Sequence, residues 1–283
     1  MCFLFRSNLR RKIVIDPISS WVLLLFLWDR QMEKVENVLK ENERIDQLMQ
    51  YDLKIIQSPK VFSFSLDAVL LGHFAKLRNR DDQKVIDLCS GNGAVALMIS
   101  QKTKSPVYGI EIQEELVDMA RRSIQLNGLE DRISMIHKDL KDLSTVHYDT
   151  VDVITCNPPY FPLEENGQVN PNEHLAIARH ELYLSLDELL HTISKLLKMN
   201  GKAYIVYRPS RFLELMDGMR KYHITPKSVQ FVHPNEQSNA NMVLVEGIKY
   251  GKEAGFKMLP PLYVHDESGN YRPEVRKILY GEE

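Results

Sequence analysis

Short runs of β-branched residues alternate with longer segments of helical spacing between Lys84 and Tyr207, and this alternation restricts the fold more than any other feature of the chain. Each short run predicts a buried strand, and the segments between the runs predict helices. Strand and helix in alternation indicate a parallel sheet with right-handed crossovers, an α/β architecture. The predicted strands are "KVIDL", "PVYGIEI", "RISMIHKDL", "VDVITC" and "KAYIVY".

Two of the intervening segments carry clear helix boundaries. The segment "QEELVDMARRSIQLNGL" has apolar residues at helical spacing and is predicted to close at Gly128. The segment "SLDELLHTISKLLKMNG" begins with Ser185 as a predicted N-cap, followed by Glu188 at the capping-box position. We expect this second helix to extend through "KLLKMNG".

Two further strand-like runs, "KSVQFVH" and "NMVLVEGIKY", follow at the end of this region. The short loop between them allows an antiparallel pair at the edge of the sheet and leaves no room for a crossover helix. The predicted fold is therefore Rossmann-like: a mostly parallel seven-stranded sheet with an antiparallel edge hairpin and helices on both faces.

The chain divides into four expected segments. In residues 1–31, "RRK" precedes the apolar run "SSWVLLLFLW", an arrangement that resembles a signal peptide. The apolar run is too short to cross a bilayer as a helix, which needs about 20 apolar residues. Because Met32 opens a polar stretch typical of a protein start, we expect a non-native or disordered extension there, the alternative being a membrane-associated segment. We expect helix and loop in residues 32–60, the main domain in residues 61–250, and a surface-packed tail in residues 251–283.

Composition excludes few functions. The 283 residues carry a net charge of −2, which argues against a uniformly basic surface but allows a local basic patch for a nucleic acid. Three cysteines without C-x-x-C spacing predict neither a disulfide framework nor a metal cluster, and they favour the cytoplasm. The sequence predicts no metal and no membrane partner, and it leaves the oligomeric state open.

Residues just after the strands of such a sheet line its ligand site, and the first strand here runs into a glycine-rich loop. In "DLCSGNG", Gly91 and Gly93 allow the backbone to pass close to a ligand, although a tight turn also requires glycine. Asp87 is the acidic residue at the tip of this strand. The loop lacks the full G-x-G-x-x-G pattern of dinucleotide-binding proteins.

The next two strands also end on acidic residues. Glu111 follows the loop at about the 20-residue offset of a ribose-binding carboxylate, although a charge at a helix N-terminus is the structural alternative. Asp139 precedes Leu140, a pair suited to an adenine amine and its ring face, or else to an ordinary turn. Together the acidic strand ends predict a nucleoside site without a phosphate-binding loop, and S-adenosylmethionine is the common cofactor of that kind.

The fourth strand ends in "NPPY", where two prolines stop the hydrogen-bond ladder. An amine conjugated to a ring or carbonyl is a poor nucleophile because its lone pair is delocalised. The side-chain oxygen of Asn157 and the carbonyl of Pro158 are suited to accept its two hydrogens and to aim its nitrogen at the sulfonium methyl. Tyr160 offers a flat face for stacking, and plain strand punctuation is the alternative for the prolines.

The order "DLCSGNG", "GIEI", "KDL", "NPPY" resembles class I S-adenosylmethionine-dependent methyltransferases, and "NPPY" resembles the subgroup that methylates planar amino groups. The resemblance covers about residues 60–250; Cys89 departs from it, since many members have glycine there. "FSFSLDAVLLGHF" is similar to a family segment that folds over the cofactor. The resemblance implies cofactor contacts by Phe64, Ser65, Asp67, Asp87, Gly91, Gly93, Glu111, Ile112, Asp139, Leu140 and Asn157.

Substrate identity rests on resemblance. The same motif serves adenine amines in nucleic acids and the glutamine amide of peptide-chain release factors. With "QSPKVFSFSLDAVLLG" and "ARHE", the pattern most closely resembles bacterial tRNA adenine methyltransferases that act beside the anticodon of a valine tRNA. A protein that binds S-adenosylmethionine or RNA without turnover is the non-enzymatic alternative. The expected catalytic residues are Asn157, Pro158 and Tyr160, and the expected substrate contacts are Pro159, Tyr160, Phe161, Arg179 and His180.

Overall fold

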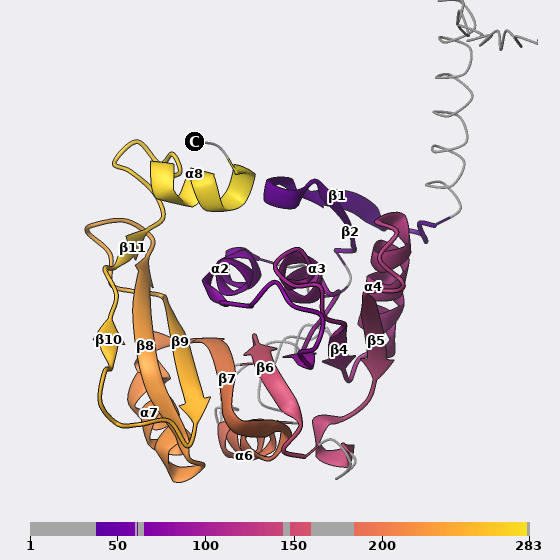
Figure 1. Ribbon diagram of the computed structural model, residues 1–283. Coiled ribbons are helices and arrows are strands. Elements are labelled where there is room, and N and C mark those ends of the chain that lie inside the picture. The colour runs from indigo at the N-terminus through magenta and orange to yellow at the C-terminus, as the bar shows by residue number, and fades with distance from the viewer. Residues whose placement is uncertain (1–37, 60, 62–64, 144–147, 160–183, 282–283) are drawn as a thin grey trace, which may run out of the picture. The chain divides into compact units, whose positions relative to one another are not determined.

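The computed structural model describes residues 38–59, 61, 65–143, 148–159 and 184–281. Contacts between residues divide the chain into two compact units, Met1–Lys40 and Glu41–Glu283. The labelled helices and strands of Figure 1 all belong to the second unit. In the part of the chain that the structure describes, no helix is both long enough and apolar enough to cross a lipid bilayer.

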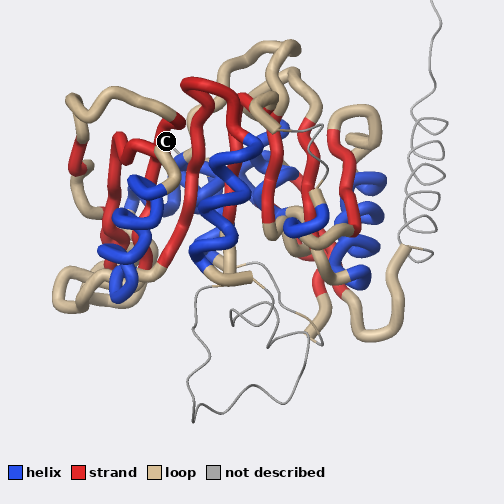
Figure 2. The backbone as a smooth tube through the Cα atoms, turned by 90° about the horizontal axis from the view of Figure 1, so that it is seen from below, coloured by secondary structure: helices blue, strands red, loops and turns tan. Residues whose placement is uncertain are grey.

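Nine of the described strands form one mixed sheet, and Figure 2 shows strands running side by side. They are β3 (Val85–Leu88), β4 (Val107–Glu111), β5 (Ile133–His137), β6 (Val151–Cys156), β7 (Leu197–Tyr207), β8 (Ile224–His233), β9 (Met242–Lys249), β10 (Lys257–Met258) and β11 (Leu262–Tyr263). Their order is β10-β8-β9-β7-β6-β3-β4-β5, with β11 also paired to β8. The order reverses at β3, and such switch points are where open α/β sheets bind ligands.

The prediction of a mostly parallel sheet with an antiparallel pair is confirmed. Strands β3 to β7 pair parallel to one another, whereas β9 is antiparallel to both β7 and β8. The sheet has nine strands rather than seven because two short strands, β10 and β11, pair with β8. Both come from the segment 251–283, which therefore extends the sheet instead of only packing on its surface.

Helices cover both faces of the sheet, as predicted. They are α2 (Leu66–Phe74), α3 (Ala94–Ser100), α4 (Glu114–Leu126), α6 (Leu186–Leu196), α7 (Phe212–Lys221) and α8 (Pro273–Tyr280). Neighbouring strand residues point to opposite faces: Val85 packs in the apolar cluster of α2, α3 and α4, whereas Ile86 packs in that of α6 and α7. In Figure 1, α2 and α3 lie between the sheet and a further layer that contains α8.

Two of the three predicted helix ends agree with the structure. Gly128, with φ +62°, follows the end of α4. Ser185 caps α6 in a complete capping box with Glu188. The far end of α6 was predicted too late: the helix stops at Leu196, and Leu197 already belongs to β7. Asn200 has a left-handed φ of +62°, which a right-handed helix cannot contain.

Residues 44–57, expected to be helix or loop, form a separate antiparallel hairpin of β1 (Arg44–Leu48) and β2 (Leu53–Gln57). Side chains satisfy the outer edge of β2. Asn127, just after α4, accepts from the backbone N–H of Lys54 at 2.9 Å and donates to its carbonyl at 2.7 Å. The N–H of Ile56 donates to the hydroxyl of Ser123 at 2.9 Å. These three hydrogen bonds attach the hairpin to α4.

Replacing Asn127 with alanine should lower the free energy of unfolding by about 1 to 3 kcal/mol, because the N–H and carbonyl of Lys54 lose their partner in a half-buried place. Urea denaturation of the full chain measures the change. The control is Gln125→Ala, an exposed position on the same helix. A loss no larger than that of the control would mean that water replaces the amide at no cost.

Candidate active site

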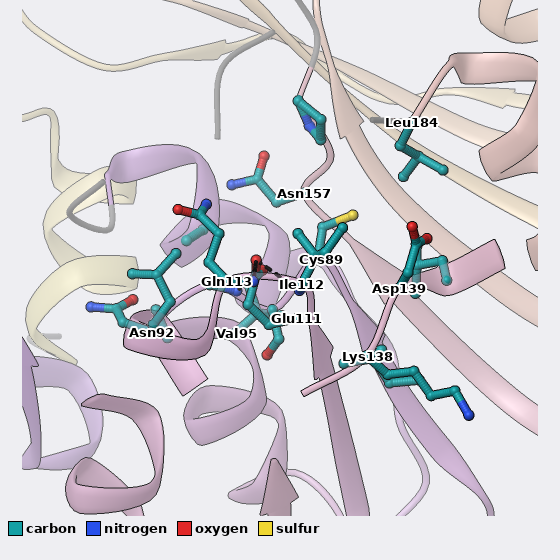
Figure 3. A pocket seen from close by; sticks show the side chains of 18 residues that line it. Cys89, Asn92, Val95, Glu111, Ile112, Gln113, Lys138, Asp139, Asn157 and Leu184 are labelled. Atoms are coloured by element: carbon teal, nitrogen blue, oxygen red, sulfur yellow. Dashed lines mark hydrogen bonds between the residues drawn. The ribbon is translucent and has the colours of Figure 1, made fainter. Parts of the chain in front are cut away.

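A pocket opens at the carboxyl ends of β3, β4, β5 and β6, the place expected for a doubly wound sheet (Figure 3). It encloses about 890 Å³ of empty space, its open mouth included. The lining residues are Ala68, Cys89, Ser90, Gly91, Asn92, Ala94, Val95, Ile110, Glu111, Ile112, Gln113, Leu116, Lys138, Asp139, Leu140, Asn157, Pro159 and Leu184.

Glu111 is the buried carboxylate at the centre of the pocket wall. Three backbone N–H groups converge on it: Gly91 donates to Oε2 at 2.9 Å, and Ile112 and Gln113 donate to Oε1 at 3.0 Å each. Burial raises the pKa of Glu111, and the three amides oppose that rise. Oε1 already accepts two of these bonds, whereas Oε2 accepts one, so Glu111 can still accept a hydrogen bond from a hydroxyl group of a ligand through Oε2.

The two predicted glycines have different roles. Gly91 lines the pocket with φ +56°, and a Cβ there would meet no atom within 4 Å. Gly93, with φ +85°, faces away from the pocket, where a Cβ would lie 3.1 Å from the Cβ of Ala120. We predicted a cofactor contact for Gly93, but its lack of a side chain serves the packing of the loop against α4.

Asp87, also predicted to contact the cofactor, lies beneath the glycine-rich loop and outside the pocket lining. It is 1% exposed, and its two carboxylate oxygens accept from the hydroxyls of Thr155 at 2.6 Å and Ser90 at 2.5 Å. Thr155 lies on β6 two residues before Asn157. Asp87 therefore connects the loop after β3 to the strand that carries "NPPY", a supporting position.

The free energy of unfolding should depend on pH through Asp87. Burial raises its pKa from 3.8 to about 7 in the folded chain. Unfolding then releases a proton between about pH 4 and about pH 7, so the stability that the protonated form contributes is lost as pH rises through this window. Asp87→Asn, which keeps the shape but cannot titrate, should reduce that fall by up to about 4 kcal/mol. Urea denaturation across this window tests it; parallel profiles for the two proteins would contradict it.

Asp139 and Leu140 enter the pocket from the loop after β5. The N–H of Lys141 donates to Oδ1 of Asp139 at 2.9 Å, which caps a short 3₁₀ turn and fixes the carboxylate (Figure 3). Leu140 is buried and contributes an apolar surface beside it. Ile112 lines the pocket from the loop after β4. The structure thus brings the predicted acidic and apolar residues of the second and third strand ends together.

The segment before α2 only partly reaches the pocket. Ser65 and Asp67 hydrogen-bond to each other through their side chains, and the N–H of Ala68 donates to Asp67 at 2.9 Å. Neither Ser65 nor Asp67 lines the pocket, whereas Ala68 does. These two predicted cofactor contacts instead organise the start of α2, and Phe64 lies outside the described residues.

"NPPY" lies at the mouth of the pocket as far as the structure describes it. Asn157 and Pro159 line the pocket, while Pro158 is buried and is not among the lining residues. The Oδ1 atom of Asn157 is buried, with no hydrogen-bond partner among the residues that the structure describes. Figure 3 shows the amide of Asn157 above Glu111 and Gln113. The remaining predicted residues, Tyr160, Phe161, Arg179 and His180, lie outside the described residues.

Eleven lining residues were not singled out as ligand contacts from the sequence, among them Asn92, Gln113 and Cys89. Asn92 lies inside the glycine-rich loop and donates from its side-chain amide to the carbonyl of Ile56 at 3.1 Å, which connects the loop to β2. Gln113 caps the start of α4 at the pocket wall. Cys89 has its side chain in the pocket and a left-handed φ of +54°. Of these three residues, only Gln113 could have been identified as a pocket residue from the sequence, because it lies two residues after the strand-end carboxylate Glu111.

Comparisons with known proteins agree with this geometry. The family described as "Methyltransferase small domain" matches residues 52–222. A tRNA1(Val) (adenine(37)-N6)-methyltransferase of Dyadobacter fermentans is 27% identical over 218 residues, which are 75% of this chain and 87% of that protein. Among solved structures, a predicted O-methyltransferase of Agrobacterium tumefaciens has a TM-score of 0.59 at 20% identity, covering 76% of this chain and 96% of its own. Pyrococcus horikoshii TYW2 in complex with MeSAdo has a TM-score of 0.52 at 15% identity. The match covers 75% of this chain and 73% of that chain.

The sheet order, the pocket at its switch point and the structural neighbours define a class I methyltransferase fold. The chain belongs to the methyltransferase small domain family, whose match covers more than half of its length. The predictions of this fold, of a methyltransferase and of S-adenosylmethionine as its cofactor are therefore confirmed.

Proposed function

We propose that this protein transfers the methyl group of S-adenosylmethionine to the exocyclic 6-amino group of an adenine in tRNA. The observation that carries the proposal is Oδ1 of Asn157, a buried acceptor in the pocket wall without a partner among the described residues. A buried acceptor left unsatisfied costs about 1 to 3 kcal/mol, so its retention favours a ligand that donates to it. An amino group is such a donor.

The pocket fits S-adenosylmethionine. The carboxylate of Glu111 would accept from the ribose hydroxyls, and the space beside Gly91 would admit the methionine part. Asp139 would accept from the adenine amine, with Leu140 against the ring. When bound, the cofactor supplies a sulfonium-activated methyl group.

Asn157 and Pro158 would position the amine for transfer. Each of the two acceptors takes one hydrogen of the amino group, which holds the nitrogen in line for attack on the methyl carbon. Nitrogen becomes strongly acidic as the new C–N bond forms and the C–S bond breaks. Its proton can then leave through an acceptor or to water, so the step needs no strong general base.

The choice of tRNA is supported by the relative in Dyadobacter fermentans, whose name gives adenine 37 of a valine tRNA. We extend this to an anticodon-loop adenine of a valine tRNA for the present chain. A loop adenine is already partly unstacked, so extruding it into a pocket costs less than it would in a duplex. Such a substrate is consistent with a cytoplasmic protein.

Methyl-labelled S-adenosylmethionine with separate pools of unmodified tRNA, duplex DNA and peptide-chain release factor tests the proposal. We expect label in tRNA, recovered as N6-methyladenosine, with a valine tRNA preferred over others. Label only in the release factor would contradict the adenine substrate and indicate a glutamine amide instead, whose amino group carries the same two hydrogens. Cofactor binding without label in any pool would favour a binding protein without turnover.

A further inference from the structure

The two cysteines in the described part of the chain lie close together at the ends of two neighbouring strands. Leu88 on β3 pairs with Cys156 on β6, and Cys89 is the residue directly after Leu88. Cys89 and Cys156 both pack in the apolar cluster on the α6 and α7 face of the sheet. Burial raises the pKa of Cys156 well above its usual value, and the neighbouring Cys89 thiol adds to the rise. Both sulfurs are free thiols in this structure.

Cys89 has a backbone conformation that favours glycine. Its φ of +54° lies in the left-handed region, which costs a non-glycine residue on the order of 1 to 3 kcal/mol. Glycine at this position would remove that strain and leave the loop path intact. A side chain that is kept at this cost, and that lies against a second thiol, points to a use for the sulfur.

We propose that Cys89 and Cys156 form a redox-active thiol pair that closes into a disulfide between the glycine-rich loop and the strand leading to Asn157. Cys89 lines the pocket and is half-buried, whereas Cys156 is 0% exposed. A small oxidant therefore reaches Cys89 first, and Cys156 resolves the oxidised sulfur. In a reducing compartment, disulfides of this kind are transient and redox-sensing.

The oxidation balances with hydrogen peroxide as the oxidant. The Cys89 thiolate attacks one peroxide oxygen, the O–O bond breaks, and the products are a sulfenic acid and, after protonation, one water. The sulfur of Cys156 then attacks the sulfur of Cys89, forming the S–S bond and releasing the second water. Two thiols lose two electrons in total, and one peroxide gains them. A dithiol reductant reverses the reaction.

The disulfide would constrain both the glycine-rich loop and the end of β6, the two segments that carry Gly91 and Asn157. A disulfide holds its two Cβ atoms about 3.8 Å apart, which would fix Cys89, two residues before Gly91, to the residue before Asn157. Displacing a catalytic group by a fraction of an ångström slows transfer, so oxidation should lower methylation at least about tenfold. This effect on rate rests on the proposed function, whereas the thiol pair itself does not.

The test is peptide mapping by mass spectrometry after hydrogen peroxide treatment of the full chain carrying Cys2→Ser, which removes the third cysteine. We expect a peptide pair linked through Cys89 and Cys156, and its loss on treatment with dithiothreitol. S-adenosylhomocysteine, by covering Cys89 in the pocket, should slow formation of the linked pair. In Cys156→Ala, dimedone should trap a sulfenic acid on Cys89 instead.

Three outcomes would overturn the proposal. The first is that Cys89 becomes oxidised but no linked peptide forms. The second is that the linked peptide forms at the same rate with and without S-adenosylhomocysteine. The third is that peroxide removes the same fraction of methylation activity in Cys156→Ala as in the parent protein. The first two readouts need no substrate. A linked pair in a protein that labels no tRNA would therefore contradict the proposed substrate and leave the thiol pair standing.

Discussion

Asn157→Ala should lower the rate of methyl transfer by about a hundredfold or more and leave the affinity for S-adenosylhomocysteine nearly unchanged. The lost oxygen would accept one hydrogen of the substrate amine, and removing one preorganised hydrogen-bond partner of a reacting group costs about 100- to 1,000-fold. In the proposed binding mode, other residues of the pocket, Glu111 above all, would hold the cofactor. Single-turnover methylation and calorimetric titration measure the two quantities separately.

The same substitution should not destabilise the fold. Oδ1 of Asn157 is buried and has no partner among the described residues, so its removal takes away an unsatisfied group. Asn79→Ala, at an exposed amide remote in sequence, is the control and should change neither rate nor stability. Measuring the melting temperature and the methylation rate on one preparation separates a catalytic role of Asn157 from a structural one. A variant that loses rate only in proportion to its folded fraction would assign Asn157 a structural role.

The central sheet could be predicted from the sequence because each strand and helix has its own local pattern. The β1–β2 hairpin could not. Its strands, Arg44–Leu48 and Leu53–Gln57, mix polar and apolar residues without clear alternation. The contacts that stabilise β2 come from Ser123 and Asn127, about 70 positions away in the chain. Such long-range polar pairing leaves no trace in a local window.

The candidate site was predictable at the level of strand ends but not of side-chain direction. A residue at a strand tip can point into the crevice or under the loop, and both places are buried. Glu111 points to the pocket wall, whereas Asp87 points to Thr155 and Ser90. The same limit applies to Gly93, whose missing Cβ makes room for Ala120 rather than for a ligand. Sequence spacing identified the loop but could not separate ligand contacts from loop supports.

Cys89 shows a different limit. A cysteine where many members of the resembled family have glycine indicates, from the sequence, only that the loop path could differ. The structure has the left-handed backbone at Cys89 and packs this residue against the apolar cluster that contains Cys156, which lies 67 positions further along the chain. Having cysteine instead of glycine therefore leaves the loop path unchanged and adds a thiol near Cys156. This proximity depends on the pairing of β3 with β6, which the sequence alone does not show.

Glu111→Gln should weaken binding of S-adenosylhomocysteine by about 10- to 100-fold. Three backbone N–H groups already donate to the carboxylate, two to Oε1 and one to Oε2. A glutamine oxygen can take only one of these places, so its NH₂ group must face either Gly91 or the pair Ile112 and Gln113. Losing a hydrogen bond to a charged group costs about 1.5 to 3 kcal/mol, and about 1.4 kcal/mol corresponds to a tenfold change in affinity.

The ribose would lose a partner as well, because one amide oxygen cannot accept from two hydroxyls as well as a carboxylate can. Glu114→Gln is the matched control: it makes the same change in charge three residues away, at an exposed position on the first turn of α4. Calorimetric titration of both variants separates the roles. Equal affinities for the two variants would mean that Glu111 serves only to hold the loop after β3 against the start of α4, and that the ribose lies elsewhere.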